Sequence, residues 1–454
     1  MARKNHSTAW DMTEGKPTSL LLRFSIPLLI GNVFQQLYSM VDSVVIGRFV
    51  GANELGGIGC AGSIDYLVFS IGYGMSSAVG ILVAILYGAG EKERLNRAIY
   101  NCFYILFAAS LLIAGIGFCG AGWFLQLLNT PEELFPHAEM YLKVVFLGNI
   151  ATIYYGGISS VMRAFGDSKT PLIILVFCCL LNIVLDLLFV LEFHWDVFGV
   201  ALATVLSQTA SAVACFWAAN RTLPLFRYQK GSLKPDRALL RRCIGLGLPL
   251  MGQNMLIAVS TSALQSAVNG FGSVMVTAYT TVGKLDQIVQ QPYNSIATAL
   301  STYTGQNVGA GKDQRIRQGL RAAIGINVGF TAVMAILVWL FGEQMAAFFI
   351  SDSEVIAAAT VGLRMNGVFY VFLGLLYAVR GLLNGAGDAT YSAINGIIEL
   401  VCRMTFALVL IPLIGQWGCF LCGGVTWMLA SLVSVWRYGS GRWRIKAKQN
   451  ADVR

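Results

Sequence analysis

Long apolar stretches, separated by short polar segments, run along almost the whole chain of 454 residues. A lipid-facing backbone must satisfy its own hydrogen bonds, and the stretches lack the alternation of barrel strands, so helices are predicted. A helix crosses the hydrocarbon of a bilayer with about 20 residues. Twelve stretches are long enough, at roughly 20–49, 55–88, 98–126, 138–163, 170–192, 198–220, 240–270, 275–308, 318–342, 355–383, 391–413 and 417–437. The pattern therefore predicts an all-α membrane protein with twelve transmembrane helices.

The composition supports a membrane location. Hydrophobic residues make up 56% of the chain and charged residues only 12%, whereas soluble domains carry about 25% charged residues. This scarcity of charge excludes a soluble or disordered chain, and also a nucleic-acid-binding protein despite the net charge of +9. The polar residues before Leu20 do not resemble a signal peptide, so we expect the first span to be retained.

The positive charges lie on one side of the predicted spans. Of the 32 Lys and Arg residues, 27 fall in the two tails and the even-numbered connections. The odd-numbered connections hold only Arg48, together with nine acidic residues. Because Lys and Arg accumulate on the cytoplasmic side, we expect a multi-pass protein of the cell membrane with both termini in the cytoplasm.

The chain repeats itself at an offset of 221 or 222 residues. The recurring pairs are Pro27 with Pro249, Asn32 with Asn254, Asp65 with Asp286, Gly88 with Gly309, Gly166 with Gly387, and Asp167 with Asp388. Each half holds six spans, so the halves share one topology. Two six-helix bundles related by an internal repeat, around a central cavity, are the arrangement of a secondary transporter.

The domain organisation follows from this repeat. We expect an amino-terminal lobe of helices one to six at 1–220 and a basic cytoplasmic linker at 221–239. A carboxy-terminal lobe of helices seven to twelve is expected at 240–438, followed by a cytoplasmic tail at 439–454.

Several motifs carry a family resemblance. The run NVFQQLYSMVDSVVIGRFVG, the paired proline-containing first helices, and the loops RAFGDSKTP and NGAGDAT resemble the multidrug and toxic compound extrusion (MATE) family. The resemblance covers the chain from about residue 18 to 438. It implies twelve helices in two lobes, alternating access, and export of drugs or organic cations driven by entry of H⁺ or Na⁺.

Acidic residues at membrane depth are candidates for ion coupling, because burying a carboxylate there is costly. Five acids lie inside the predicted spans, and Asp42 is the strongest candidate. It shares a helix face with Gln35 and Tyr38, which are expected to line a cavity. The alternative is a carboxylate held by a buried partner, with no role in transport. The remaining acids are Asp65, Asp186, Asp286 and Glu399.

Asn182 and Asp186 are four residues apart on the fifth span and share a face. Two carboxylates that approach each other in low dielectric cannot both stay ionised cheaply, so one takes a proton or a cation lies between them. Oxygen ligands of this kind also suit Na⁺. The resemblance matches Asp42, Asn182, Asp186 and Thr204 to the amino-lobe site of the family, so these four are the predicted ion-coupling residues. For Thr204 the alternative is a packing hydroxyl bonded to its own backbone.

Pro27 is the predicted hinge of the first helix, because proline removes one backbone hydrogen bond and makes bending easy. Protonation or Na⁺ binding at the acids would bend this helix and expel substrate. A static kink is the alternative.

The carboxy-terminal half lacks a seventh-helix acid, since Ile257 stands where the sodium-type branch of the family has Glu. This puts a second cation site there in doubt. Its expected cavity residues are Gln287, Gln291 and Asn294, which share a face of the eighth span with Gln290. They serve as interhelix hydrogen-bond donors and acceptors in the alternative interpretation.

Other charged residues are expected to be structural. Glu399 and Arg403, four apart, are expected to pair with each other, with a gating pair as the alternative. Arg163, Asp167 and Asp388 are expected to form salt bridges that order cytoplasmic loops, with substrate contact as the alternative.

Three function classes are compatible with a polytopic helical protein. The sequence favours a multidrug antiporter; the alternatives are a flippase for a lipid-linked or other amphiphilic precursor, and a membrane enzyme or channel. No nucleophile with a base is evident, and the Cys and His residues are too dispersed for a disulfide framework or a metal centre. We therefore expect no enzyme and no cofactor beyond the coupling ion. The expected partners are small-molecule drugs or organic cations and membrane lipid, without nucleic acid, and the protein is expected to be a monomer.

Overall fold

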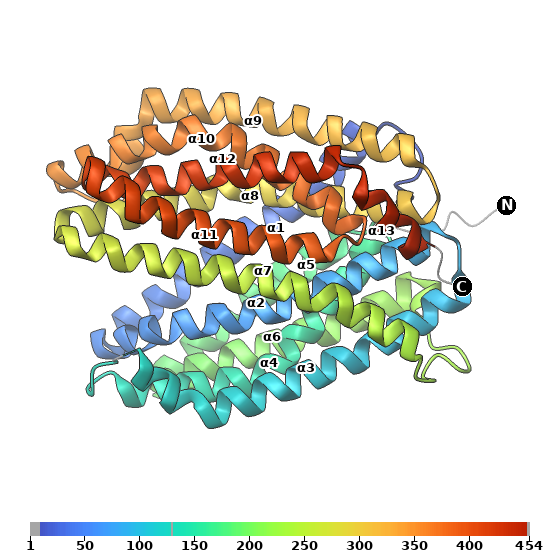
Figure 1. The fold of residues 1–454 in the computed structure, drawn as a ribbon. Coiled ribbons are helices and arrows are strands. Elements are labelled where there is room, and N and C mark those ends of the chain that lie inside the picture. The colour runs from blue at the N-terminus through green and yellow to red at the C-terminus, as the bar shows by residue number, and fades with distance from the viewer. Residues whose placement is uncertain (1–9, 129, 452–454) are drawn as a thin grey trace. The chain divides into compact units, whose positions relative to one another are not determined.

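The computed structural model describes residues 10–128 and 130–451, and these residues form a succession of long helices (Figure 1). Three of the 27 cations assigned above to the cytoplasmic side, Arg3, Lys4 and Arg454, lie outside the described residues. The six long helices of the first half are α1 (Pro17–Val45), α2 (Ala52–Gly88), α3 (Lys92–Leu127), α4 (Phe135–Ala164), α5 (Lys169–Leu187) and α6 (Asp196–Thr222). Those of the second half are α7 (Arg237–Val268), α8 (Ser273–Gly309), α9 (Asp313–Ala347), α10 (Ser353–Gly385), α11 (Ala389–Ile414) and α12 (Trp417–Gly439).

Short helical segments complete the described chain. Two are π-helical, η1 (Ile46–Val50) after α1 and η2 (Leu188–Glu192) after α5. Two are 3₁₀ turns, η3 (Pro224–Phe226) and η4 (Asn269–Phe271), and a final helix α13 (Arg442–Ala451) follows α12.

Eleven of the long helices in the described residues are long and apolar enough to cross a membrane. The exception is α8, where Lys284, Asp286 and several glutamines reduce the mean hydropathy. The prediction of an all-α membrane protein built from two six-helix repeats is confirmed.

The repeat extends to backbone conformation. Both α2 and α8 have 37 residues, and they end at Gly88 and Gly309. Each is followed by a glycine with positive φ, +73° at Gly90 and +67° at Gly311. Glycine adopts this left-handed conformation without steric cost, so the duplicated Gly-Ala-Gly motif ends corresponding helices in the same way.

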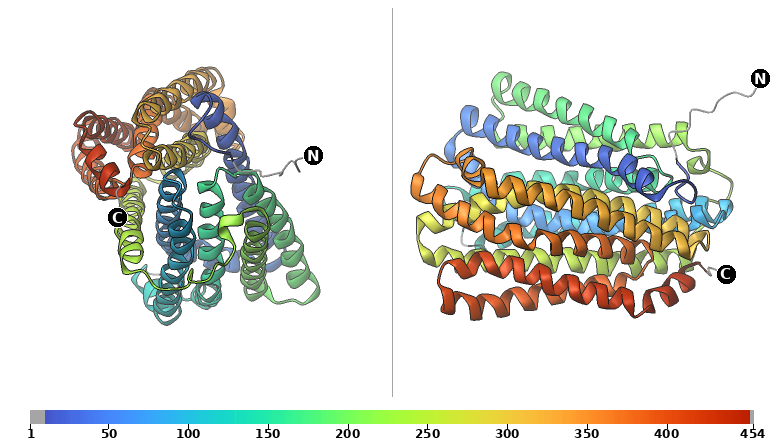
Figure 2. Two further views of the ribbon diagram at one scale, coloured as in Figure 1. Left: turned by 90° about the vertical axis from the view of Figure 1, so that its right-hand side faces the viewer. Right: turned by 90° about the horizontal axis from the view of Figure 1, so that it is seen from above.

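The described residues form two units of helices, each a bundle of elongated helices (Figure 2). The first contains Pro27–Met251 and the described residues up to Asp11; the second contains Met12–Ile26 and Gly252–Arg454. In the first unit α4 packs against α2, α3 and α6, and in the second α10 packs against α8, α9 and α12. The repeat therefore uses corresponding helices as the centre of each bundle. The limits of the basic linker, 221–239, and of the two lobes on either side of it stay predictions.

The basic linker is attached to α3. Asn96 Nδ2 donates to the carbonyl oxygen of Leu225 at 2.7 Å, and Asn101 Nδ2 donates to that of Lys234 at 3.1 Å. The backbone N–H of Asp236 donates to Asn101 Oδ1 at 2.8 Å. Two buried asparagines thus satisfy linker backbone groups that have no partner in a helix or sheet.

Candidate functional site

Three polar side chains of the first unit, those of Asp42, Asn182 and Asp186, meet the backbone of Thr204 where α1, α5 and α6 approach one another. In the orientation that satisfies its hydrogen bonds, the Asn182 amide nitrogen donates to Asp42 Oδ1 and to Asp186 Oδ2, each at 3.1 Å. The Asn182 oxygen accepts from the backbone N–H of Thr204 at 3.2 Å. The structure therefore brings together the four residues predicted for ion coupling, and their role in transport stays a prediction.

The fifth-helix residues are the most deeply placed members of this acid–amide cluster, defined as Asp42, Asn182, Asp186 and Thr204. Asn182 is 1% exposed and Asp186 is fully buried, whereas Asp42 and Thr204 are half-buried. Asp186 Oδ1 has no hydrogen-bond partner among the described residues. Such an oxygen is costly to bury as a charged group, and a proton or a cation shared with Asp42 would satisfy it.

Both carboxylates immediately precede a π-helical segment. η1 begins four residues after Asp42, and η2 begins two residues after Asp186. The widened turns close with i to i+5 hydrogen bonds, from Gly51 N to Ile46 O at 3.0 Å and from Phe193 N to Leu188 O at 3.3 Å. Segments of this kind often accompany functional sites because their backbone is easily rearranged.

An apolar cluster lies next to the site along the chain. It consists of Val45, Ile46, Val190 and Val200, all buried. Val45 and Ile46 follow Asp42 by three and four residues, Val190 follows Asp186 by four, and Val200 precedes Thr204 by four, so each member lies about one helical turn from a residue of the site.

Two tyrosines join the cluster. Tyr38 Oη lies 3.4 Å from Thr204 Oγ1, within hydrogen-bonding reach. Tyr141 of α4 interacts electrostatically with Asp42, Asp65 and Asp186. Sequence reasoning missed Tyr141, because its proximity to acids on three other helices leaves no trace in local spacing. The electrostatic interaction of Tyr141 with Asp65 also places Asp65 in the neighbourhood of the site, which the sequence could not do.

The predicted cavity residues are less enclosed. Gln35 and Gln287 are exposed, and Gln291 and Asn294 are half-buried. On α8, the adjacent face is occupied by interhelix contacts, since Tyr377 Oη donates to Gln290 Oε1 at 3.2 Å. Gln290 therefore joins α8 to α10, and the cavity role of the other residues stays a prediction.

The second unit has its own buried carboxylate on α8. Asp286 accepts hydrogen bonds from Tyr370 Oη at 2.6 Å and from Asn366 Nδ2 at 2.8 Å. Both donors belong to α10, and neither was identified from the sequence. This carboxylate corresponds to Asp65 in the repeat, and two donors compensate for its burial.

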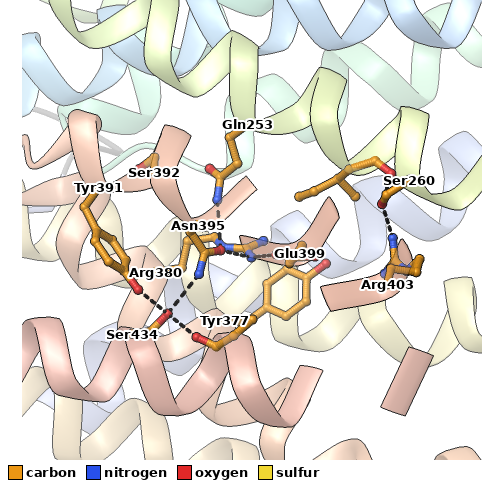
Figure 3. A network of polar contacts seen from close by, with 12 residues as sticks. Gln253, Ser260, Tyr377, Arg380, Tyr391, Ser392, Asn395, Glu399, Arg403 and Ser434 are labelled. Carbon is orange, nitrogen blue, oxygen red and sulfur yellow. Dashed lines mark hydrogen bonds and ion pairs between the residues drawn. The ribbon is translucent and has the colours of Figure 1, made fainter. Parts of the chain in front are cut away.

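A polar network joins α7, α10, α11 and α12 in the second unit (Figure 3). Glu399 forms an ion pair with Arg380 of α10, which differs from the expected pairing with Arg403. Arg403 instead donates to Ser260 Oγ of α7. Arg380 on α10 thus takes the place expected for Arg403. Because α10 packs against α11, the Arg380 side chain lies within ion-pair distance of Glu399.

Asn395 is the centre of this network. It accepts hydrogen bonds from Arg380 and, at 3.4 Å, from Gln253 Nε2 of α7, and it donates to Ser434 Oγ at 3.2 Å (Figure 3). Gly396 permits close approach at this point, since a Cβ there would lie 2.9 Å from Gln253 Cα. The segment of α7 beyond Pro249 is thus fixed to α11.

The loop acids order their loops. Asp388 forms a two-point ion pair with Arg437, with distances of 2.8 and 3.1 Å. Asp167 accepts from the backbone N–H groups of Lys169 and Thr170 at 3.1 and 3.0 Å, at the start of α5. These contacts agree with the structural role expected for both acids.

Comparison with known proteins identifies the fold and the family. The profile of the MatE family matches residues 27–188 and 249–409, one segment in each repeat. The probable multidrug resistance protein YpnP of Bacillus subtilis is 32% identical over 444 residues, covering 96% of this chain and 98% of that protein. The multidrug export protein MepA of Staphylococcus saprophyticus is 20% identical, covering 90% of this chain and 89% of that protein.

Solved structures share the architecture. A MOP superfamily transporter from Pyrococcus furiosus superimposes with a TM-score of 0.89 at 21% identity, with all of both chains covered. A MATE structure in the bent conformation gives the same TM-score at 21% identity, covering 97% of this chain and 98% of that one. These likenesses concern the fold. Together with the profile match, which begins at Pro27 and again at Pro249, they show that the chain belongs to the MatE family of multidrug and toxic compound extrusion transporters.

Proposed function

We propose that this protein is a secondary active antiporter that exports drugs or organic cations in exchange for H⁺ or Na⁺ by alternating access. The acid–amide cluster is the observation that carries the proposal. In this cluster the amide of Asn182 donates hydrogen bonds to two carboxylates, those of Asp42 and Asp186, at membrane depth. The names of the relatives support the substrate class, since YpnP is called a probable multidrug resistance protein and MepA a multidrug export protein.

The chemistry of the cluster suits a coupling ion. When both carboxylates are ionised, their repulsion in a site of low dielectric favours uptake of a proton or Na⁺. Oxygens of Asp42, Asp186 and Thr204 would hold Na⁺, or one carboxyl would take the proton. Either event neutralises charge next to Asn182 and alters its hydrogen bonds to α1 and α5.

The response of α1 would expel the substrate. Pro27 lies fifteen residues before Asp42, about 22 Å along a helix, so a change at the carboxylate must travel along α1 to reach it. η1, four residues after Asp42, offers a nearer point of rearrangement. Bending of α1 would then couple ion binding to the affinity for substrate, because the two ligands would favour different conformations of one helix.

Orientation and location belong to the same proposal. The distribution of Lys and Arg supports cytoplasmic termini in the cell membrane. A flippase for a lipid-linked precursor is not favoured by the names of the relatives, and the acidic cluster suits cationic cargo better than an anionic headgroup.

Dye-evoked ion entry tests the proposal. Purified protein in proteoliposomes is exposed to a cationic dye while internal pH and internal Na⁺ are recorded with entrapped indicators. Antiport predicts that the dye gradient drives one of these ions in the opposite direction. Dye movement that produces no counter-movement of either ion contradicts the proposal.

A further inference from the structure

The last helix of the described chain, α13, must lie close to the end of a membrane span. α12 ends at Gly439, and α13 begins at Arg442 after a turn at Gly441, whose φ is +69° (Figure 1). Three residues of extended chain reach about 10 Å. α13 therefore begins within about one Debye length of the membrane surface at low salt.

One face of α13 is packed against its own unit. Trp443 is 1% exposed and Ala447 is 7% exposed, and these residues are four apart on one helix face. Trp443 Nε1 donates to the carbonyl oxygen of Tyr438 at 3.1 Å, and the two rings stack with centroids 5.7 Å apart. α13 contacts α8 and α12. The rotation of α13 about its axis is thereby fixed.

The opposite face is basic around one apolar residue. Ile445, on the side of the helix away from Trp443 and Ala447, is 60% exposed. Arg442, Lys446 and Lys448 are also exposed, and residues 442–451 contain no acid. No ion pair is found for these three cations within the described residues. Arg437, at the end of α12, differs from them because it is neutralised by Asp388.

We propose that this face, defined as Arg442, Ile445, Lys446 and Lys448, binds the anionic headgroups of the surrounding bilayer. Clusters of Lys and Arg directly after a transmembrane helix are attracted to anionic lipid, and an exposed apolar residue among them can enter the interface. The short connection to α12 keeps these cations at the membrane surface, whereas an acidic protein or a nucleic acid would have to be recruited to it. Because α13 also packs on α8, lipid charge would act on a helix of the second unit.

The experiment uses the full chain. The exposed Cys119 and the half-buried Cys60 and Cys402 are replaced by Ala, and Ile445→Cys then carries an environment-sensitive fluorophore. The protein is reconstituted either in phosphatidylcholine or in a mixture with phosphatidylglycerol. Quenching by a nitroxide-labelled phospholipid and by water-soluble iodide is compared at low and high ionic strength.

Binding predicts more lipid quenching and less iodide quenching in the mixture containing phosphatidylglycerol, with reversal at high salt. The triple variant R442Q/K446Q/K448Q should lose this dependence, since each cation near an anionic surface contributes roughly fivefold to partitioning. The matched control K230Q/R237Q/R241Q removes the same charge from exposed positions in the linker and the first turns of α7, and should keep the dependence on phosphatidylglycerol. All six positions are exposed, where substitutions rarely disturb folding.

Two results would overturn the proposal. One is equal quenching by each reagent in both lipid mixtures, which would show that anionic headgroups do not bind this face. The other is an equal loss of the phosphatidylglycerol effect in both triple variants, which would assign it to overall charge. Neither readout depends on transport, so the outcome is independent of the proposed antiport.

Discussion

Asn182 on α5 donates one amide hydrogen bond to Asp42 on α1, with 3.1 Å between Nδ2 and Oδ1. The same nitrogen lies 3.1 Å from Asp186 Oδ2. A neutral side chain therefore holds two carboxylates that would otherwise repel each other across two helices. Any change in the charge of either carboxylate therefore alters the hydrogen bonds that Asn182 makes to both.

Replacing this bridge should destabilise the protein. Asn182→Leu preserves approximate volume but leaves the half-buried Asp42 and the buried Asp186 without their amide donor, at a cost of about 1–3 kcal/mol. Thermal unfolding in detergent should show a lower midpoint than for the wild type. Asn220→Leu, at an exposed position of α6, serves as the control and should change the midpoint little. Equal midpoints for the two variants would show that the bridge contributes nothing to stability.

Breaking the Arg380–Glu399 pair should cost more than breaking a surface pair. Glu399 is 3% exposed, so Glu399→Gln leaves the Arg380 charge poorly compensated, at about 3–5 kcal/mol. The double variant R380Q/E399Q should recover part of this loss. Glu139→Gln breaks the partly exposed pair with Lys143 at 2.9 Å and should cost at most about 1 kcal/mol. With the single variant R380Q, the unfolding free energies of the buried-pair variants form a double-mutant cycle, and additivity of the two substitutions would refute the coupling.

Close packing between α8 and α10 depends on glycine. A Cβ at Gly385 would lie 2.3 Å from the carbonyl oxygen of Ser301, whereas one at Gly329 on α9 meets nothing within 4 Å. Gly385→Ala should therefore lower the unfolding midpoint, because the α8 backbone must shift. Gly329→Ala should stabilise by about 0.5–1 kcal/mol through reduced backbone entropy. A midpoint for Gly385→Ala at or above that of the wild type would contradict the packing.

Much of this architecture was predictable from sequence because bilayer crossing imposes long apolar runs. Repeated motifs at a constant offset then implied two equivalent bundles, and the duplicated glycine turns agree with that repeat. Asn182 and Asp186 could be placed on one face because their spacing matches the helix period. Asp42 could be assigned to the same site only through the family resemblance, because no local sequence pattern relates a residue on α1 to residues on α5.

Hydrogen bonds and ion pairs between helices that are distant in sequence could not be predicted from helical spacing. The donors to Asp286 come from α10, 80 and 84 residues away. Tyr141 was missed for the same reason. Glu399 and Arg403 had ideal spacing, yet Arg380 from α10 pairs with Glu399. Helical spacing describes only neighbours on one helix, whereas buried charges are satisfied by whichever side chain the packing brings closest.

The most direct test of the account is dye export from proteoliposomes under an imposed H⁺ gradient, an imposed Na⁺ gradient, or neither. Wild-type protein should export a cationic dye only when at least one ion gradient is present. Asp42→Asn should reduce gradient-driven export by about tenfold or more, the equivalent of one charged hydrogen bond. Asp313→Asn, at an exposed position of α9, should leave it unchanged. Export at the wild-type rate without a gradient, or by the Asp42→Asn variant, would contradict ion coupling through the acid–amide cluster.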